Sequence, residues 1–122
     1  MRRFALLAAL GSLAVVPAFA QDPVKVDPKH YKVLYEDAGI RVLRVTYGPH
    51  EKSVMHEHPA LAGVFATDAH FKFAQPDGTT QEREGKKGDP ISASAEKHNP
   101  ENVGDKTAQV ILVEFKGPAA KK

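Results

Sequence analysis

The sequence contains no cysteine. Disulfide bonds are therefore excluded, and the fold must be held by its core, by a metal ion or by association with a second copy. The chain also lacks any segment with a sustained hydrophobic period of 3.6 residues, and it has no internal repeat of useful length. These absences predict a low helix content.

One long apolar run is present, at the start of the chain. Residues 1–3 (Met-Arg-Arg) are a basic start, residues 4–16 are almost all apolar, and the run ends in Ala-Phe-Ala at 18–20. This is the pattern of a secretory signal, so we expect cleavage after Ala20 and a mature chain that begins at Gln21. A membrane anchor is the alternative, but the run is shorter than the roughly 18 to 20 apolar residues that cross a bilayer. We therefore expect a periplasmic or secreted protein without a membrane partner after removal of the signal.

The predicted mature chain has no excess of charge of either sign. The 17 Lys and Arg residues include Arg2 and Arg3, so cleavage leaves 15 basic residues against 15 Asp and Glu. Such a balance provides no basic surface, and we expect no nucleic-acid partner. The 102 residues that remain of the 122 are enough for one domain with one core.

Short apolar or alternating runs, separated by turn residues, fill the mature chain after residue 30. Residues 21–30 hold two prolines and no hydrophobic period, and we expect an extended arm there. Turn residues recur every 8 to 15 positions, a spacing typical of an all-β barrel or sandwich, and Asn99-Pro100 is one of the predicted turns. The predicted strands are 31–35, 40–47, 54–58, 60–66, 70–74, 79–83, 91–95 and 108–115, followed by a flexible tail at 117–122.

The last predicted strand alternates in polarity. Ile111, Val113 and Phe115 are apolar, whereas Glu114 and Lys116 have the other parity. Because side chains alternate across a strand, we expect the odd-numbered set to face the core.

Two histidines separated by one residue provide the first chemical signal. His56 and His58 lie on a predicted strand, so both imidazoles leave the same face and can converge on one ion, while Glu57 points the other way. His98 follows forty residues later, and closing a barrel can bring it to the pair; a surface loop is the alternative position for it. Three histidines with an open position are the ligand set of a catalytic zinc site, and iron, manganese, nickel or copper would also suit them.

These residues resemble the motifs of the small single-domain bacterial cupins. Residues 48–59 contain a His-x-His pair in the context of the family's first motif, and residues 98–102 supply the His-x3-Asn of the second. The segments around them are similar to the family's opening and closing strands, so the likeness covers residues 31–116. The resemblance implies a cupin-type double-stranded β-helix, that is, a jelly-roll barrel, with a divalent metal ion held by the three histidines.

The sequence departs from the family motifs at several positions. Ala62 or Gly63 stands where the family's glutamate ligand is expected, and Ser94 and Glu96 replace the usual proline and glycine. Without that carboxylate, three neutral imidazoles would leave the 2+ charge of the ion uncompensated and one more coordination position open. We therefore expect a site that favours small anionic or chelating ligands.

The resemblance implies several kinds of function. Three-histidine cupins include iron dioxygenases of thiols and diketones, so the first hypothesis is a metal-dependent enzyme, dioxygenase-like or isomerase- or lyase-like, that acts on a small molecule. A non-catalytic module that binds or senses a metal or small molecule, and a metal-free structural barrel, are the alternatives. Glu51 and Glu101 are the nearest carboxylates for acid or base chemistry, but neither spacing assigns a catalytic residue, and no organic cofactor is indicated. The resemblance is also the ground for expecting a homodimer, since small cupins pair through their outer strands.

The other polar candidates have less specific positions. We expect His70 to face outward, His50 to lie in the turn before the pair, with a place at the entrance of the site as the alternative, and His30 to be solvated in the arm. Asn102 is expected to hold its loop through bonds from its side chain to the backbone. The residues expected in the core or the pocket wall are the aromatic ones, Tyr47, Phe65, Phe71, Phe73 and Phe115.

Overall fold

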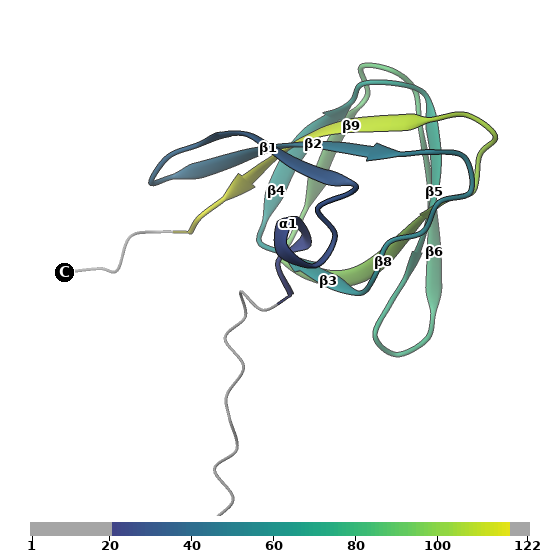
Figure 1. The fold of residues 1–122 in the computed structure, drawn as a ribbon, viewed down its shortest axis with the longest axis horizontal. Helices are drawn as coiled ribbons and strands as arrows, with labels where there is room; N and C mark the ends of the chain where they lie inside the picture. The colour runs from purple at the N-terminus through teal and green to yellow at the C-terminus, as the bar shows by residue number, and fades with distance from the viewer. Residues whose placement is uncertain (1–20, 118–122) are drawn as a thin grey trace, which may run out of the picture.

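Nine β-strands and one short helix make up residues 21–117, the part of the chain that the computed structural model describes (Figure 1). The elements in chain order are α1 (Pro23–Val26), β1 (Tyr31–Glu36), β2 (Ile40–Tyr47), β3 (His56–His58), β4 (Leu61–Phe65), β5 (Ala69–Ala74), β6 (Thr80–Gly85), β7 (Pro90–Ala93), β8 (Glu96–Asn102) and β9 (Ala108–Phe115). The predicted signal peptide, residues 1–20, lies outside the described residues, as do residues 118–122 of the predicted tail. No helix within residues 21–117 is long and apolar enough to cross a bilayer.

The strands form two antiparallel sheets that wrap around a common interior (Figure 1). One sheet has five strands in the order β1-β2-β9-β4-β7, and the other has four in the order β3-β8-β5-β6. Strands distant in sequence are therefore neighbours, as in jelly rolls, where each sheet buries its apolar face against the other. The prediction of an all-β jelly-roll barrel is confirmed.

The core fills the space between the two sheets. Its members are inward-facing side chains that are nearly inaccessible to solvent. They are Tyr31, Leu43, Val45, Tyr47, Leu61, Phe65, Phe71, Ala108, Val110 and Leu112. Three of the aromatic residues predicted for the core or pocket wall are in this set. The fourth, Phe73, packs against it, whereas Phe115 is 45% exposed and its predicted position is wrong.

The predicted face of β9 is wrong as well. The residues that point into the barrel are the even-numbered ones, Val110, Leu112 and Glu114, while Ile111 is only half-buried. The prediction failed because it assumed that a charged side chain points to solvent. Glu114 instead lies inside the barrel, where other side chains bind its carboxylate.

The strand β8 replaces a predicted loop and turn. Asn99 and Pro100 lie in the middle of this strand, which pairs with β3 on one side and with β5 on the other. Proline lacks an N–H, which favoured the prediction of a turn. Pro100 contributes its carbonyl instead, which accepts a hydrogen bond from the Ser53 N–H at 2.9 Å.

The predicted extended arm is partly helical and is packed on the barrel. The side chain of Asp22 caps α1 by accepting a hydrogen bond from the Val24 N–H at 3.0 Å, and Pro23 occupies the start of the helix, a position where its missing N–H costs nothing. His30, at the end of the arm, is buried and stacks on Tyr47 with 4.3 Å between ring centroids. The prediction that His30 is solvated is therefore wrong.

Candidate metal centre

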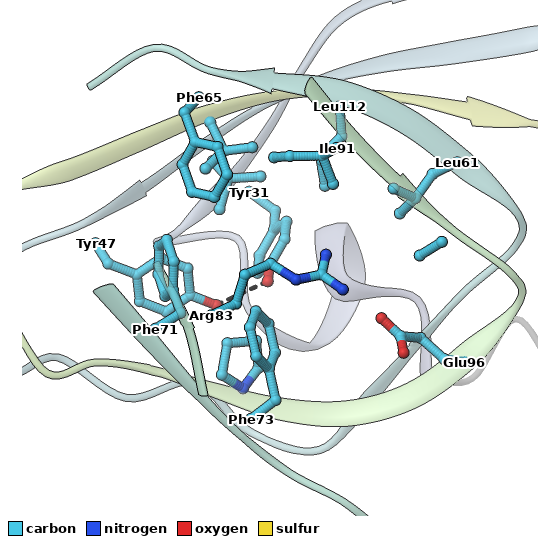
Figure 2. Close-up of a pocket in the computed structure, with 14 residues that line it drawn as sticks. Tyr31, Tyr47, Leu61, Phe65, Phe71, Phe73, Arg83, Ile91, Glu96 and Leu112 are labelled. Carbon is cyan, nitrogen blue, oxygen red and sulfur yellow. Dashed lines mark hydrogen bonds between the residues drawn. The ribbon is translucent and has the colours of Figure 1, made fainter. Parts of the chain in front are cut away.

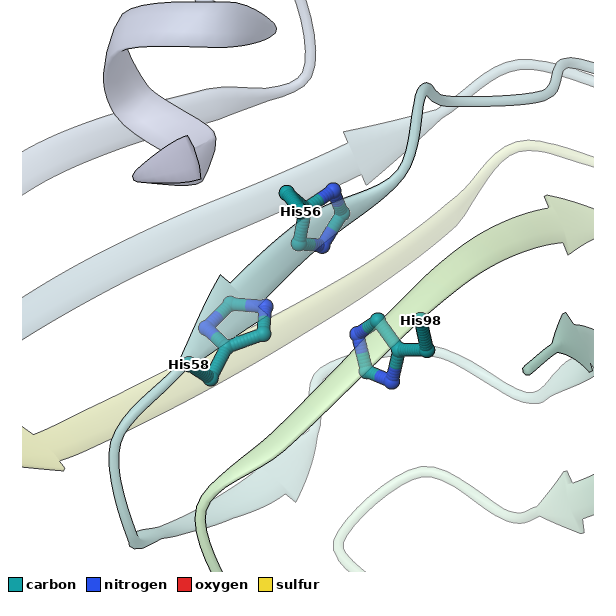
Figure 3. A group of neighbouring side chains, drawn as sticks. All are labelled: His56, His58 and His98. Atoms are coloured by element: carbon teal, nitrogen blue, oxygen red, sulfur yellow. The ribbon is translucent and has the colours of Figure 1, made fainter. Parts of the chain in front are cut away.

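The three predicted histidines meet inside the barrel. β3 pairs with β8 in a register that sets His56 directly opposite His98, and strand alternation turns His58 to the same face as His56. One ring nitrogen from each residue lies within 4.8 Å of the other two, and the ring centroids are 4.9 to 5.2 Å apart. Figure 3 shows the rings turned toward one shared space. The convergence of the three rings is present as predicted, although His98 comes from a strand rather than a loop.

Hydrogen bonds on the far side of two rings orient them. The Nδ1–H of His56 donates to the Val54 carbonyl at 2.8 Å, and the Nδ1–H of His58 donates to Glu114 Oε2 at 2.7 Å. Because neither acceptor can itself donate, Nδ1 carries the proton in both rings, and the neutral form of each ring has its lone pair on Nε2. Metal-bound histidines in proteins are held in this way by a carbonyl or carboxylate behind them.

Burial keeps two of the imidazoles neutral. His56 is fully inaccessible to solvent, and burial lowers its pKa to about 3, with a further contribution from His58 and His98 beside it. Burial also lowers the pKa of His98. A neutral imidazole is the form that binds a metal, so no proton has to be displaced from these rings near neutral pH.

Glu114 is the most important residue that the sequence analysis missed. It is 1% exposed, and besides His58 it binds Arg41, whose Nε lies 2.7 Å from Glu114 Oε1. Arg41 in turn makes two hydrogen bonds to Asp22, at 2.7 and 2.9 Å, and these bonds are the main cause of its raised pKa. The sequence signal for Glu114 was its interruption of the apolar run 110–115 in β9.

This network changes the predicted charge of the site. Glu114 and Asp22 carry one negative charge each and Arg41 carries one positive charge, which leaves a net charge of −1 behind His58. The prediction that the charge of an ion would be wholly uncompensated is therefore wrong. Glu114 binds Nδ1 of His58, so the compensation would act through the His58 ring and not through direct ligation.

The backbone explains why the expected glutamate position is not used. In β4, Leu61 and Phe65 are buried, so Gly63 shares their inward face while Ala62 faces the other way. A Cβ at Gly63 would lie 2.3 Å from the Ile111 carbonyl oxygen, so this position has no room for a side chain. The carboxylate that reaches the histidines comes instead from Glu114, the residue paired with Leu61 across the sheet.

Two tyrosine hydroxyls lie near His56 Nε2, on the opposite edge of that ring from the Nδ1 contact. The Tyr31 hydroxyl lies 3.1 Å from His56 Nε2 and 2.7 Å from the Tyr47 hydroxyl, and burial raises the pKa of both tyrosines. Both hydroxyls therefore stay protonated. Because Nε2 of His56 carries a lone pair, Tyr31 is a hydrogen-bond donor beside it.

A second polar network runs from His56 toward the surface. The Ser53 hydroxyl lies 3.3 Å from His56 Nδ1 and donates to Asp27, whose carboxylate is 2.7 Å from His30 Nδ1. His30 Nε2 lies 3.3 Å from Glu51, which also binds Lys29 at the surface and whose pKa these bonds lower to about 2. Glu51 thus belongs to the support behind the site, not to its interior.

The remaining predicted residues lie away from the three rings. His70 faces outward as predicted, 3.1 Å from Glu82 and 3.2 Å from Glu84, and the exposed His50 pairs with Asp105 at 2.9 Å.

The prediction for Asn102 is confirmed. Its amide donates to three backbone carbonyls, those of Tyr47, Gly48 and Lys106, and its carbonyl accepts from the Gly104 N–H. Glu101, its neighbour on β8, has the opposite parity to His98 and faces away from the cluster.

A cavity of about 60 Å³ lies beside the cluster, in the barrel interior (Figure 2). Its walls are mainly apolar, and Phe73 links it to the histidines, with its ring centroid 5.0 Å from that of His98. Tyr31 also belongs to the wall, as do two charged residues, Arg83 and Glu96. Glu96 Oε1 is 3.1 Å from His98 Nδ1, but at angles outside those of a hydrogen bond, so this nitrogen is buried without a hydrogen-bond partner among residues 21–117.

Comparison with known proteins assigns the architecture. No protein-family model matches the sequence, and a search of curated proteins gives no match. Solved structures do match: a cupin domain from Bordetella pertussis is 18% identical, with a TM-score of 0.66 over 71% of this chain and 92% of that one. A Klebsiella pneumoniae protein with a double-stranded β-helix domain is 20% identical, with a TM-score of 0.58 over 74% and 78%. The chain has the cupin fold.

An archaeal structure supports the same assignment. An RmlC-like cupin family protein from Methanocaldococcus jannaschii has a TM-score of 0.56 at only 9% identity, over 70% of this chain and 77% of that one. The cupin fold of the present chain therefore survives almost complete divergence of sequence. The strand pairings that bring the three histidines together are part of this cupin-fold barrel.

The role of Glu114 can be tested by Glu114→Gln. The amide keeps the shape and can still accept from His58, but Arg41 loses one of its two charged partners inside the barrel. We expect the free energy of unfolding in urea to fall by about 1 to 3 kcal/mol, less than for a fully orphaned charge because Asp22 remains bound to Arg41.

A matched control is Glu36→Gln, which removes the exposed ion pair with Lys116. That change should cost about 0 to 1 kcal/mol, since solvent screens the pair. An equal decrease in the free energy of unfolding for the two variants would show that the Glu114–Arg41 contact stabilises the fold no more than an exposed ion pair does.

Proposed function

We propose that the three-histidine cluster of this cupin barrel binds one divalent first-row metal ion through His56, His58 and His98. The observation that carries the proposal is the convergence of the three rings, two of which have a hydrogen-bond acceptor behind them. Two of the rings have their Nδ1–H bound from behind, which leaves Nε2 as the ligand atom, and all three rings are buried and turned to one space. The donor set fits zinc, iron, manganese, nickel or copper.

A metal-free structural barrel is the alternative that the same observation disfavours. Imidazole lone pairs in an apolar interior cost about 1 to 3 kcal/mol each when no donor satisfies them. Among the described residues, the Tyr31 hydroxyl lies beside His56 Nε2, whereas His98 Nδ1 is buried without a hydrogen-bond partner. A barrel without a ligand would be more stable with apolar residues at these positions.

We further propose that the ion serves an enzymatic reaction on a small anionic or chelating molecule. One protein of the same fold, with 16% identity and a TM-score of 0.52, is a polyketide cyclase from Streptomyces resistomycificus, and the present chain covers 64% of it. A bound divalent ion would supply Lewis-acid polarisation of a ligand oxygen. Tyr31, protonated and 3.1 Å from His56 Nε2, is the side chain placed to donate a hydrogen bond there, and the walls of the adjoining cavity are mainly apolar.

Metal binding is tested by reconstitution of the purified protein with each of the five ions, followed by desalting and elemental mass spectrometry. We expect about one ion per chain with at least one of them, and an ion-dependent rise in the unfolding temperature, because only the folded chain presents the site. His56→Ala should abolish both effects.

The control is His70→Ala, since His70 pairs with surface carboxylates and faces away from the cluster. This variant should bind as much metal as the wild type. Absence of stoichiometric metal from the wild type, or its retention by His56→Ala, would favour the metal-free barrel.

Catalysis is separated from simple binding by turnover. The metal-loaded protein is incubated with a panel of thiols, diketones and phenols, and oxygen uptake and the spectrum of each compound are followed. We expect at least one compound to be converted, with loss of the conversion in His56→Ala. Saturable binding of a compound without any conversion would identify a binding or sensing module.

Export from the cytoplasm also belongs to the proposal. It is supported by the basic start and the apolar run of residues 1–20. When the full chain is expressed in a Gram-negative host, we expect the protein in the periplasmic fraction, with a mass that corresponds to a start at Gln21. An uncleaved chain in the membrane fraction would show an anchor instead.

The homodimer stays a prediction. The apolar surface available for it includes Leu34 and Tyr35, which are exposed on the edge strand β1.

A further inference from the structure

An arginine occupies an inward-facing position of β6. This strand is at the edge of the four-stranded sheet, and its register on β5 sets Arg83 opposite Phe71. Side chains of directly paired residues lie on the same face of a sheet, and Phe71 is part of the buried core. Arg83 therefore enters the barrel from its edge. Inward-facing positions of packed sheets are usually occupied by apolar side chains.

The guanidinium of Arg83 lies in the cavity beside the histidines. Figure 2 shows it among the cavity-lining side chains, with the ring of Phe73 below it and the carboxylate of Glu96 beyond its tip. The residue as a whole is exposed to solvent, so the cavity is accessible where Arg83 enters it. Most of the other side chains around it are apolar, including Leu61, Ile91 and Leu112.

No carboxylate among residues 21–117 forms an ion pair with this guanidinium. Glu96 is the acidic residue on the same wall, and its carboxylate lies 3.1 Å from Nδ1 of the neutral His98. Arg41 provides the contrast, because its guanidinium is held by Glu114 and by both oxygens of Asp22. The guanidinium N–H groups of Arg83 are thus available to an anionic group of a bound ligand.

We infer that Arg83 binds the carboxylate of a small molecule whose apolar body occupies this cavity. A guanidinium presents two parallel N–H groups that match the two oxygens of a carboxylate, and the apolar walls favour a hydrocarbon or aromatic body. The inference deepens the proposed function and rests on it for the rest of the ligand, which would reach the metal at the three histidines. Recognition of the carboxylate itself needs no metal.

An inward charge on an edge strand can also serve to prevent pairing with other sheets. That role would require only a charge at this position and would not involve the cavity. If Arg83 binds a ligand, Arg83→Gln should weaken the binding of a carboxylate. If it only protects the sheet edge, Arg83→Gln should aggregate and bind the carboxylate unchanged.

The experiment compares acids with their amides. Benzoate, benzamide, hexanoate and hexanamide are titrated calorimetrically into the wild type, into Arg83→Gln and into Arg44→Gln, each with and without a bound metal ion. Arg44 is a matched control because it is an exposed arginine on the opposite face of β2 from the core residues Leu43 and Val45. Metal content and unfolding temperature are measured for every sample.

We expect at least one acid to bind the wild type and Arg44→Gln equally, and to bind Arg83→Gln roughly tenfold or more weakly, as expected for loss of a charge-assisted pair. The amides should bind all three proteins alike. The difference between acid and amide should persist without metal.

Three results would overturn the inference. They are equal affinity of wild type and Arg83→Gln for the acids, acids that bind the wild type no more tightly than their amides, and aggregation of Arg83→Gln as its only defect. If any of these occurs while the wild type holds one metal ion, the carboxylate site fails and the metal proposal stands. If metal is absent but acid binding depends on Arg83, the carboxylate site stands and the metal proposal fails.

Discussion

The register of β3 on β8 is the constraint on which the rest of the site depends. It sets His56 opposite His98, and strand alternation then turns His58 to the same side. A shift of this pairing by one residue would move two of the three rings to the other face of the sheet, because side chains alternate with a period of two. The antiparallel contact of these two segments continues past His98, through the Ser53 N–H bound to the Pro100 carbonyl and the Asn102 N–H bound to the Glu51 carbonyl, both at 2.9 Å.

Around this pairing, the barrel interior contains several charged groups that are paired with each other. Glu114, Arg41 and Asp22 connect His58 to the cap of α1, and Ser53, Asp27 and His30 connect His56 to the same N-terminal segment. The segment that was expected to be a loose arm thus supports both networks. Buried charges add little net stability, since desolvation offsets their attraction, but they hold the rings in defined orientations.

The cavity brings a second kind of chemistry to the cluster. The three rings offer nitrogen ligand atoms, whereas the cavity wall holds the cationic Arg83 together with Glu96, whose carboxylate is 3.1 Å from His98 Nδ1. A divalent ion at the histidines and the guanidinium would together favour an anionic ligand, even with the charge of −1 behind His58. The apolar walls would then select among anions by the size and shape of their hydrocarbon part.

Much of this molecule could be predicted from the sequence. Strand alternation and turn spacing determined the all-β class and most strands, with β2 and β9 at their observed bounds, and the spacing of the histidines identified the cluster. These features are local, since they depend on a period of two or on neighbouring residues. The face of β9, the burial of His30, the strand at Asn99-Pro100 and the carboxylate of Glu114 were decided only by the tertiary structure. In each case a polar group or a proline found its partner in a strand or segment distant along the chain, and local polarity carries no information about such a partner.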